Sequence, residues 1–164
     1  MRIRAATVDD AANLTELMRS AKRSWGYPNE WMQVWEARLI IDADAIIAMR
    51  VCVAEEETGI LGFYGLAGSG HTVQLEHLWV RPGQMGKGIG RALIVHAREA
   101  AASSGAEVIV IESDPHAEPF YRHIGAVRIG EIPAPAPGAP KRALPLLELT
   151  IGPRSLSVRP KPAG

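Results

Sequence analysis

The stretch from Val73 to Leu93, VQLEHLWVRPGQMGKGIGRAL, constrains the fold of this chain more than any other part of the sequence. Its first half alternates between two sets of residues and ends at Pro82-Gly83, which is typical of a strand closed by a turn. In such a strand Glu76, Leu78 and Val80 share one face. The only carboxylate of the strand is therefore predicted to lie beside two apolar side chains.

Glycine occupies every second position of the turn that follows, at Gly86, Gly88 and Gly90. Glycines let the backbone approach a bulky ligand, and the helix that begins there directs its free N–H groups to the same place. The pattern predicts a phosphate cradle or, without a ligand, a plain connection from strand to helix. The spacing does not fit the GxGxxG dinucleotide fingerprint, and Lys87 is not followed by the Ser or Thr of a P-loop. Nucleoside triphosphate chemistry is therefore not expected.

Length and composition indicate one globular domain, because the chain has 164 residues of which 47% are hydrophobic and 22% charged. We expect this domain to span residues 1–152 and to be followed by a tail, 153–164, with too few apolar residues to pack. The 18 basic and 18 acidic residues cancel, so neither nucleic acid nor a membrane surface is an expected partner. The N-terminus has no signal-peptide pattern, and the single Cys52 lies in an apolar run. Both features predict a cytoplasmic protein with a buried, inert thiol.

Hydrophobic periodicity predicts helices and strands along the whole domain. Helices are expected near 7–22, 29–39, 89–104 and 114–125, and strands near 2–6, 46–54, 60–66, 73–80, 107–112, 127–132 and 144–151. Strand 73–80, its helix and strand 107–112 should form a right-handed crossover with parallel pairing. Ligands of such units bind beyond the carboxyl ends of the strands, where the glycines lie. The prolines between 133 and 140 predict a stiff connecting loop.

Four large aromatic residues are concentrated between positions 25 and 35. Trp31 and Trp35 are four residues apart on a helical pattern, which favours a seam of the core. Trp25 and Tyr27 belong to a predicted loop, and large aromatics on loops often line binding clefts. We therefore predict that Trp25 and Tyr27 contact the substrate.

The central stretch resembles the acyl-CoA motif of the GNAT superfamily of N-acyltransferases. Val80-Arg81-Pro82 and Gly86-Lys87-Gly88-Ile89-Gly90 match this motif, whereas Met85 stands where the family usually has Arg or Gln. The stretch from Ala117 to Ala126, which contains Phe120 and Tyr121, is similar to the second signature of the family. The two motifs occur in the family's order. The resemblance implies an α/β fold, with a mixed central sheet of about six to seven strands flanked by helices.

The resemblance also implies an activity, namely acetyl-CoA-dependent transfer of an acetyl group to a primary amine of a small molecule or a protein. The backbone from Met85 to Arg91 is expected to bind the pyrophosphate, with added charge from Lys87 and Arg91, which otherwise form a solvated helix start. The residues expected to contact acetyl-CoA are Leu78, Trp79, Val80, Met85, Gly86, Lys87, Gly88, Ile89, Gly90, Arg91 and Phe120. The resemblance further implies that the partner can be a second copy of the chain, in a homodimer. No metal is expected, because the five histidines lack zinc spacing.

Acetyl transfer to an amine needs a neutral amine, a hydrogen-bond donor to the developing oxyanion and an acid that protonates the departing thiolate. By resemblance, Glu76 accepts the proton of the ammonium group directly or through water; its alternative is a structural carboxylate paired to an arginine. Tyr121 matches the tyrosine that donates to the thiolate, and its alternative is packing against CoA. A different function remains open, an acyl-CoA-binding sensor or scaffold with little catalysis, for which Met85 is the main argument.

Overall fold

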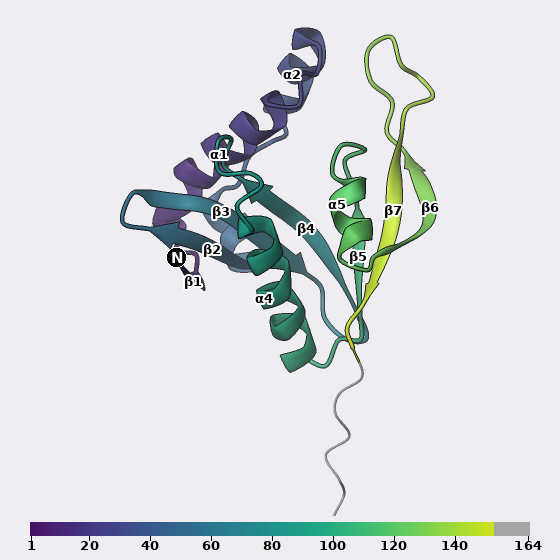
Figure 1. The fold of residues 1–164 in the computed structure, drawn as a ribbon. Coiled ribbons are helices and arrows are strands. Elements are labelled where there is room, and N and C mark those ends of the chain that lie inside the picture. Colours follow the sequence, from purple (N-terminus) through teal and green to yellow (C-terminus); the bar gives the residue numbers. More distant parts are fainter. Residues whose placement is uncertain (153–164) are drawn as a thin grey trace, which may run out of the picture.

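The computed structural model describes residues 1–152, which surround one seven-stranded mixed sheet (Figure 1). The predicted tail, 153–164, lies outside the described residues. The strands follow the order β1-β2-β3-β4-β5-β7-β6 across the sheet. Their bounds are β1 (Arg2–Ala5), β2 (Arg50–Glu56), β3 (Gly59–Ala67), β4 (Thr72–Val80), β5 (Val108–Glu112), β6 (Val127–Pro133) and β7 (Ala143–Thr150). Among the described strands only β4 and β5 pair in parallel, so the predicted parallel pairing is confirmed.

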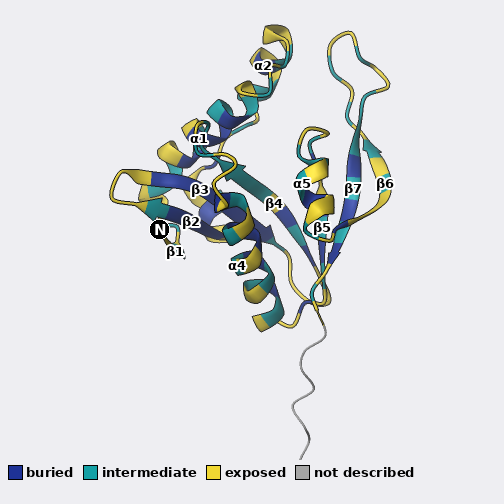
Figure 2. Cartoon of the chain, in the orientation of Figure 1, coloured by how far each residue is buried: buried dark blue, intermediate teal, exposed yellow. Residues whose placement is uncertain are grey.

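Helices cover both faces of the sheet. They are the short 3-10 turn η1 (Val8–Asp10), α1 (Ala11–Arg23), α2 (Asn29–Glu36), α3 (Ala43–Ala48), α4 (Ile89–Ser103) and α5 (Glu118–His123). Aliphatic side chains of α4 join one core cluster together with Tyr121 of α5, whereas α1 and α3 contribute to a second cluster. The central strands are buried between these layers (Figure 2). Cys52 is 6% exposed, which agrees with the buried thiol predicted from the sequence.

Helix α3 was not predicted, and it shortens the strand that follows. Asp42 caps it, because the backbone N–H of Ala45 donates to Asp42 Oδ1 over 2.8 Å. Ile46 is therefore helical, and the strand expected to begin there starts at Arg50 instead. The apolar run of residues 39–54 fits a buried strand and a buried helix equally well, and only the cap separates the two.

A β-bulge in β4 interrupts the predicted alternation at Glu76. Gly65 pairs with His77 whereas Leu66 pairs with Leu75, so Glu76 is an extra residue in the register. The alternation is reset at this point, and it is Leu75 that packs in the same cluster as Leu78 and Val80. Glu76 is exposed.

Strands β4 and β5 separate toward their carboxyl ends. Their pairing runs only from Thr72 to Leu75 on β4 and from Val108 to Ile111 on β5. Beyond it the two strands diverge plainly (Figure 1). The edge of β4 from Leu78 to Val80 is thus left without a strand on its β5 side, although it remains paired with β3 on the other side.

Candidate active site

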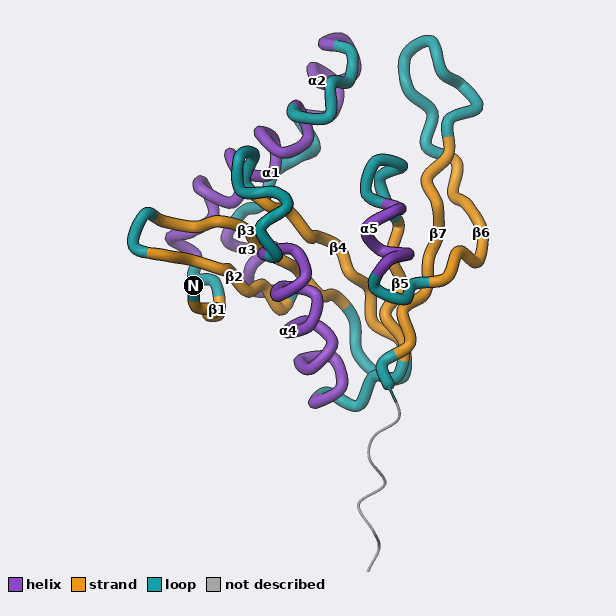
Figure 3. The backbone as a smooth tube through the Cα atoms, viewed as in Figure 1, coloured by secondary structure: helices purple, strands orange, loops and turns teal. Residues whose placement is uncertain are grey.

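A cleft of about 670 Å3 lies at the end of the sheet where β4 and β5 have separated. The loop before α4, the loop before α5 and the β6–β7 loop all lie at this end (Figure 3). Nine of the predicted acetyl-CoA contacts line the cleft: Leu78, Trp79, Val80, Met85, Gly86, Gly88, Gly90, Arg91 and Phe120. Two do not, because Ile89 is buried in the core and the exposed Lys87 donates to Gln84 Oε1 at 3.2 Å.

The glycine-rich loop presents a row of free backbone donors. Gly86 and Gly88 have left-handed φ angles of 78° and 81°, which side chains rarely adopt. None of the amide N–H groups from Met85 to Arg91 donates a hydrogen bond to a described residue. Successive free N–H groups at a helix start form a concave site that favours anions such as phosphate. The loop is thus built to hold an anionic group.

Tyr121 projects from α5 toward this cleft, although the residue as a whole is only 6% exposed. Its hydroxyl oxygen forms no hydrogen bond within residues 1–152, and it is not sealed from solvent. Burial, with a smaller contribution from the charge of Asp114, raises the pKa of this phenol. The hydroxyl therefore keeps its proton at neutral pH and is free to donate it.

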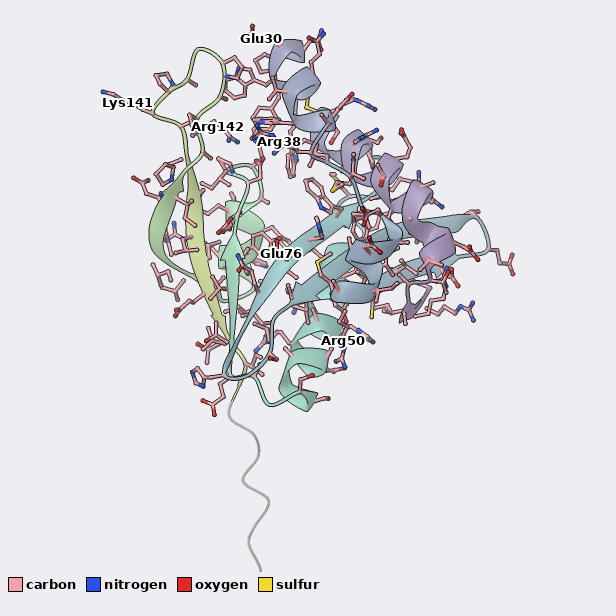
Figure 4. The ribbon with its side chains drawn as sticks, turned by 180° about the vertical axis from the view of Figure 1, so that it is seen from behind. Glu30, Arg38, Arg50, Glu76, Lys141 and Arg142 are labelled. Carbon is pink, nitrogen blue, oxygen red and sulfur yellow. The ribbon has the colours of Figure 1, made fainter. Side chains whose placement is uncertain are left out.

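Glu76 lies on β4 near the centre of Figure 4, outside the residues that line the cleft. No ion pair joins it to an arginine anywhere in the described chain, so the structural alternative raised from the sequence finds no partner. Its role as the proton acceptor stays a prediction. Glu76 belongs neither to the lining of the cleft nor to the core cluster that Leu78 and Val80 pack against.

An aromatic wall, formed by Trp25, Trp79 and His116, lines part of the cleft. The ring centroids of Trp25 and Trp79 lie 5.7 Å apart, and the His116 ring stacks on Trp25 at 5.6 Å and 7°. All three side chains line the cleft, whereas Tyr27 does not. Trp31 and Trp35 belong to neither core cluster; they pack around Tyr27 at the edge of the fold.

Asp114 is the centre of a buried polar cluster directly behind this wall. Its carboxylate accepts hydrogen bonds from Lys22 Nζ at 2.6 Å, from the Tyr27 hydroxyl at 2.8 Å and from the backbone N–H of His116 at 2.9 Å. Burial opposes the charge of Asp114, but Lys22 and these donors outweigh it and lower the pKa of the carboxyl. Arg142 lies beside the cluster, with its guanidinium over the Tyr27 ring at 5.6 Å.

Comparison with known proteins agrees with this arrangement. Residues 48–125 match the family model described as acetyltransferase (GNAT) domain. The chain carries a GNAT acetyltransferase domain. No protein of curated function matches the sequence.

Solved structures share the GNAT fold at low sequence identity. A GCN5-related N-acetyltransferase from Rhodopseudomonas palustris has a TM-score of 0.76 and 19% identity, covering 91% of this chain and 94% of that one. PaiA N-acetyltransferase from Thermoplasma acidophilum, in complex with coenzyme A, has a TM-score of 0.73 and 17% identity, covering 91% and 98%. YncA from Salmonella typhimurium, with its cofactor acetyl-CoA, has a TM-score of 0.67 and 23% identity, covering 94% and 96%. The mixed sheet flanked by helices is thus the predicted fold.

His77 of this GNAT domain is poorly suited to accept a proton. Burial lowers the pKa of His77 to about 4, and its Nδ1 accepts from Trp79 Nε1 at 3.3 Å, so it is a weak base. Within residues 1–152, no group of three or more His, Cys, Asp or Glu side chains could hold a metal ion. None of the helices described is both long and apolar enough to cross a membrane.

Sequence reasoning missed Lys22, Asp114, His116 and Arg142 as parts of this site. Asp114 and His116 carried a signal, since they follow directly on β5 at its carboxyl end, where ligands of parallel units bind. Lys22 and Arg142 carried none, because they meet Asp114 and Tyr27 only through the tertiary fold.

Proposed function

We propose that the protein transfers an acetyl group from acetyl-CoA to a primary amine of a small molecule or a protein, by direct attack of the amine in a ternary complex. One observation carries this proposal. Free backbone N–H groups and an unbonded tyrosine hydroxyl belong to residues that line the same cleft, namely Met85, Gly86, Gly88, Gly90, Arg91 and Tyr121. The first suits the pyrophosphate of the donor, and the second suits its thiolate.

The free edge of β4 would hold the remainder of the donor. The N–H of Arg81 donates to Leu61 O at 2.7 Å on the β3 side, so the alternation of the strand directs the N–H of Val80 to the opposite edge. That edge has no strand beside it after Leu75. Pantetheine amides can therefore pair with the backbone there, and the N–H of Val80 is a candidate donor to the thioester carbonyl.

The chemistry then needs a proton for the leaving sulfur. As the amine nitrogen bonds to the carbonyl carbon, negative charge develops on the carbonyl oxygen and the C–S bond breaks. Tyr121 would give its hydroxyl proton to the sulfur, and the proton lost by the nitrogen would restore the phenol. Its raised pKa keeps the phenol protonated before the reaction, so the hydroxyl can donate to the sulfur as negative charge develops there.

The first test is thermal unfolding of the full chain with acetyl-CoA, and with NADH as comparator. A ligand that binds only the folded state stabilises it by about 2.7 kcal/mol at a hundredfold excess over its dissociation constant. We expect a shift with acetyl-CoA and none with NADH. Absence of a shift at saturating acetyl-CoA would contradict the donor site itself.

The second test separates catalysis from binding. Tyr121→Phe should lower thiol release from acetyl-CoA about 100-fold while the thermal shift with acetyl-CoA is kept. Tyr64→Phe is the matched control, because its hydroxyl bonds His96 at 2.8 Å and does not line the cleft. A Tyr121→Phe variant as active as the Tyr64→Phe variant would exclude Tyr121 as the acid. Binding of acetyl-CoA without thiol release across a broad amine panel would favour the sensor or scaffold instead.

The acceptor is proposed only by class. The wall formed by Trp25 and Trp79 suits an amine with an apolar or planar component. A cytoplasmic location and a homodimer stay predictions from sequence and resemblance, and so does the contact of Tyr27 with the substrate.

A further inference from the structure

His116 lines the cleft with one ring nitrogen bound to neighbouring side chains and the other ring nitrogen free. His116 Nδ1 lies 3.0 Å from Asp114 Oδ1 and 3.0 Å from the Tyr27 hydroxyl oxygen. The side chain of His116 is 45% exposed, while that of Asp114 is only 7% exposed. The second ring nitrogen, Nε2, has no hydrogen-bond partner in the described chain, and the residue lines the cleft.

The contacts of Asp114 select one tautomer of this ring. Lys22 Nζ donates to Asp114 Oδ2 at 2.6 Å, which keeps the carboxylate ionised. An ionised carboxylate is an acceptor only, so Nδ1 must be the protonated nitrogen and Nε2 carries the free lone pair. The Tyr27 hydroxyl also donates to Asp114 and so accepts from Nδ1–H through its oxygen. A carboxylate behind an imidazole orients the ring and stabilises its charged form.

The ring plane is fixed as well. His116 stacks on Trp25 with an interplanar angle of 7°, and meets the Tyr27 ring edge-on at 84°. Trp25 lines the cleft beside it, so an acceptor lying against Trp25 would bring its amine close to Nε2. The His116 ring is therefore oriented, and its free nitrogen lies beside Trp25, where we expect the acceptor. Glu76, in contrast, is not among the residues that line the cleft.

We propose that His116 is the catalytic base of this protein, with Asp114 and Tyr27 as its positioning residues. The proposal rests on the proposed acetyl transfer. Nε2 takes one proton from the ammonium group of the acceptor, leaving a neutral amine. The amine nitrogen bonds to the carbonyl carbon, the C–S bond breaks, and the second proton of the nitrogen replaces the one that Tyr121 gives to sulfur. The imidazolium then releases its proton to water, so that amide and thiol are the only products.

Charged and titratable groups from five segments lie near this imidazole. Asp114, on the loop before α5, accepts from Nδ1 and is paired with Lys22 of α1, while Arg142, next to β7, lies over the Tyr27 ring. Tyr27, between α1 and α2, contributes a neutral hydroxyl, because burial raises its pKa to about 12. His123 of α5 lines the same cleft. Several groups can thus contribute to the pH–rate profile. The contribution of His116 must therefore be found by comparing the profiles of the variants with that of the wild type.

The experiment compares His116→Gln, Glu76→Gln and His71→Gln by thiol release from acetyl-CoA. Arylalkylamines, spermidine and lysine peptides serve as acceptors. His71→Gln is the matched control, since His71 Nδ1 lies 3.5 Å from Glu107 Oε2 in an exposed histidine–carboxylate pair that does not line the cleft. We expect kcat of His116→Gln to fall about 100-fold or more, with the thermal shift with acetyl-CoA unchanged. The pH–rate profile should lose one ionisation, and His71→Gln should match the wild type.

A second acceptor distinguishes a base from a structural residue. Phenylhydrazine is already neutral at pH 7, so it needs no proton acceptor before attack, and the loss in His116→Gln should shrink at least tenfold relative to benzylamine. An equal loss with both nucleophiles would overturn the role as base. So would a normal kcat in His116→Gln combined with a large loss in Glu76→Gln. If the wild type releases no thiol with any acceptor, the proposed function fails first and the role of His116 fails with it.

Discussion

Replacing Asp114 with Asn keeps the shape of the side chain but removes its charge from a buried pair. Lys22 Nζ lies 2.6 Å from Asp114 Oδ2, and the two side chains are 12% and 7% exposed. In the variant the ammonium group keeps the rings of Trp25, Tyr27 and Trp35, whose centroids lie 5.5, 4.9 and 4.5 Å from Nζ. Removing one partner of a buried pair typically costs 3–5 kcal/mol, and the three rings compensate in part. We expect Asp114→Asn to lower the free energy of unfolding by about 3 kcal/mol.

This loss is large enough for a simple assay. A change of 1 kcal/mol shifts Tm by roughly 2–4 °C in a domain of this size, so Asp114→Asn should melt roughly 6–12 °C lower at pH 7. Lys22→Met and the double variant complete the cycle. The double variant should lose at least about 1 kcal/mol less than the sum of the single variants, because each single change leaves one uncompensated charge.

The same pair predicts a pH dependence whose sign is fixed. The pKa of Asp114 in the folded protein lies below its ordinary value of 3.8, so the ionised form stabilises the fold above that pH. This contribution is lost as the pH falls through the folded pKa. The difference in Tm between wild type and Asp114→Asn should stay constant from pH 7 to about 5 and shrink below about 4. A variant within about 2 °C of wild type at pH 7, or a difference that grows on acidification, would refute the reasoning.

Three further predictions concern the cleft and its surroundings. Gly62→Ala would place a Cβ 2.6 Å from the backbone carbonyl oxygen of Trp79, so we expect a loss of about 1–3 kcal/mol in urea unfolding and weaker acetyl-CoA binding by calorimetry. Gly88→Ala places a side chain on a residue with a φ of 81° and should weaken acetyl-CoA binding. Gly70→Ala is the control, because Gly70 has a φ of 90° in the turn before β4. It should lower the stability by a similar amount and leave acetyl-CoA binding unchanged. Trp31→Phe removes a 2.7 Å hydrogen bond from the indole N–H to the β6–β7 loop; we expect about 1 kcal/mol lower stability and faster amide exchange in that loop, and unchanged exchange there would contradict the assignment.

The features that could be predicted best are those determined by residues close to one another in the sequence. The strand, the glycine-rich turn and the start of α4 follow one another in the chain, so Gly86 and Gly88 could be assigned to a cradle before any fold was known. The parallel crossover followed from the same local order. For both, periodicity and spacing are sufficient, because the interactions that decide them lie within about forty residues.

The errors arose where distant residues decide the structure or where one local pattern fits both a helix and a strand. The bulge at Glu76 depends on how β4 registers with β3, which alternation along one strand does not reveal. Helix α3 depends on a single cap at Asp42 within a run that also suits a strand. Asp114 meets Lys22, which is 92 positions earlier in the chain, and this contact gave no local signal.

The two sides of the cleft differ in how the chain builds them. The proposed donor side comes mainly from one continuous stretch, 78–91, whereas the proposed acceptor side joins α1 and α2 to segments about a hundred residues later. Lys22 contacts Asp114, and the indole of Trp31 reaches Pro137, 106 positions away. Arg142, at the base of the β6–β7 loop, turns toward α2, while Lys141 points away from it (Figure 4). Residues that choose the acceptor can thus vary independently of the segment that holds the donor, so one transfer machinery can be inherited intact while its targets diverge.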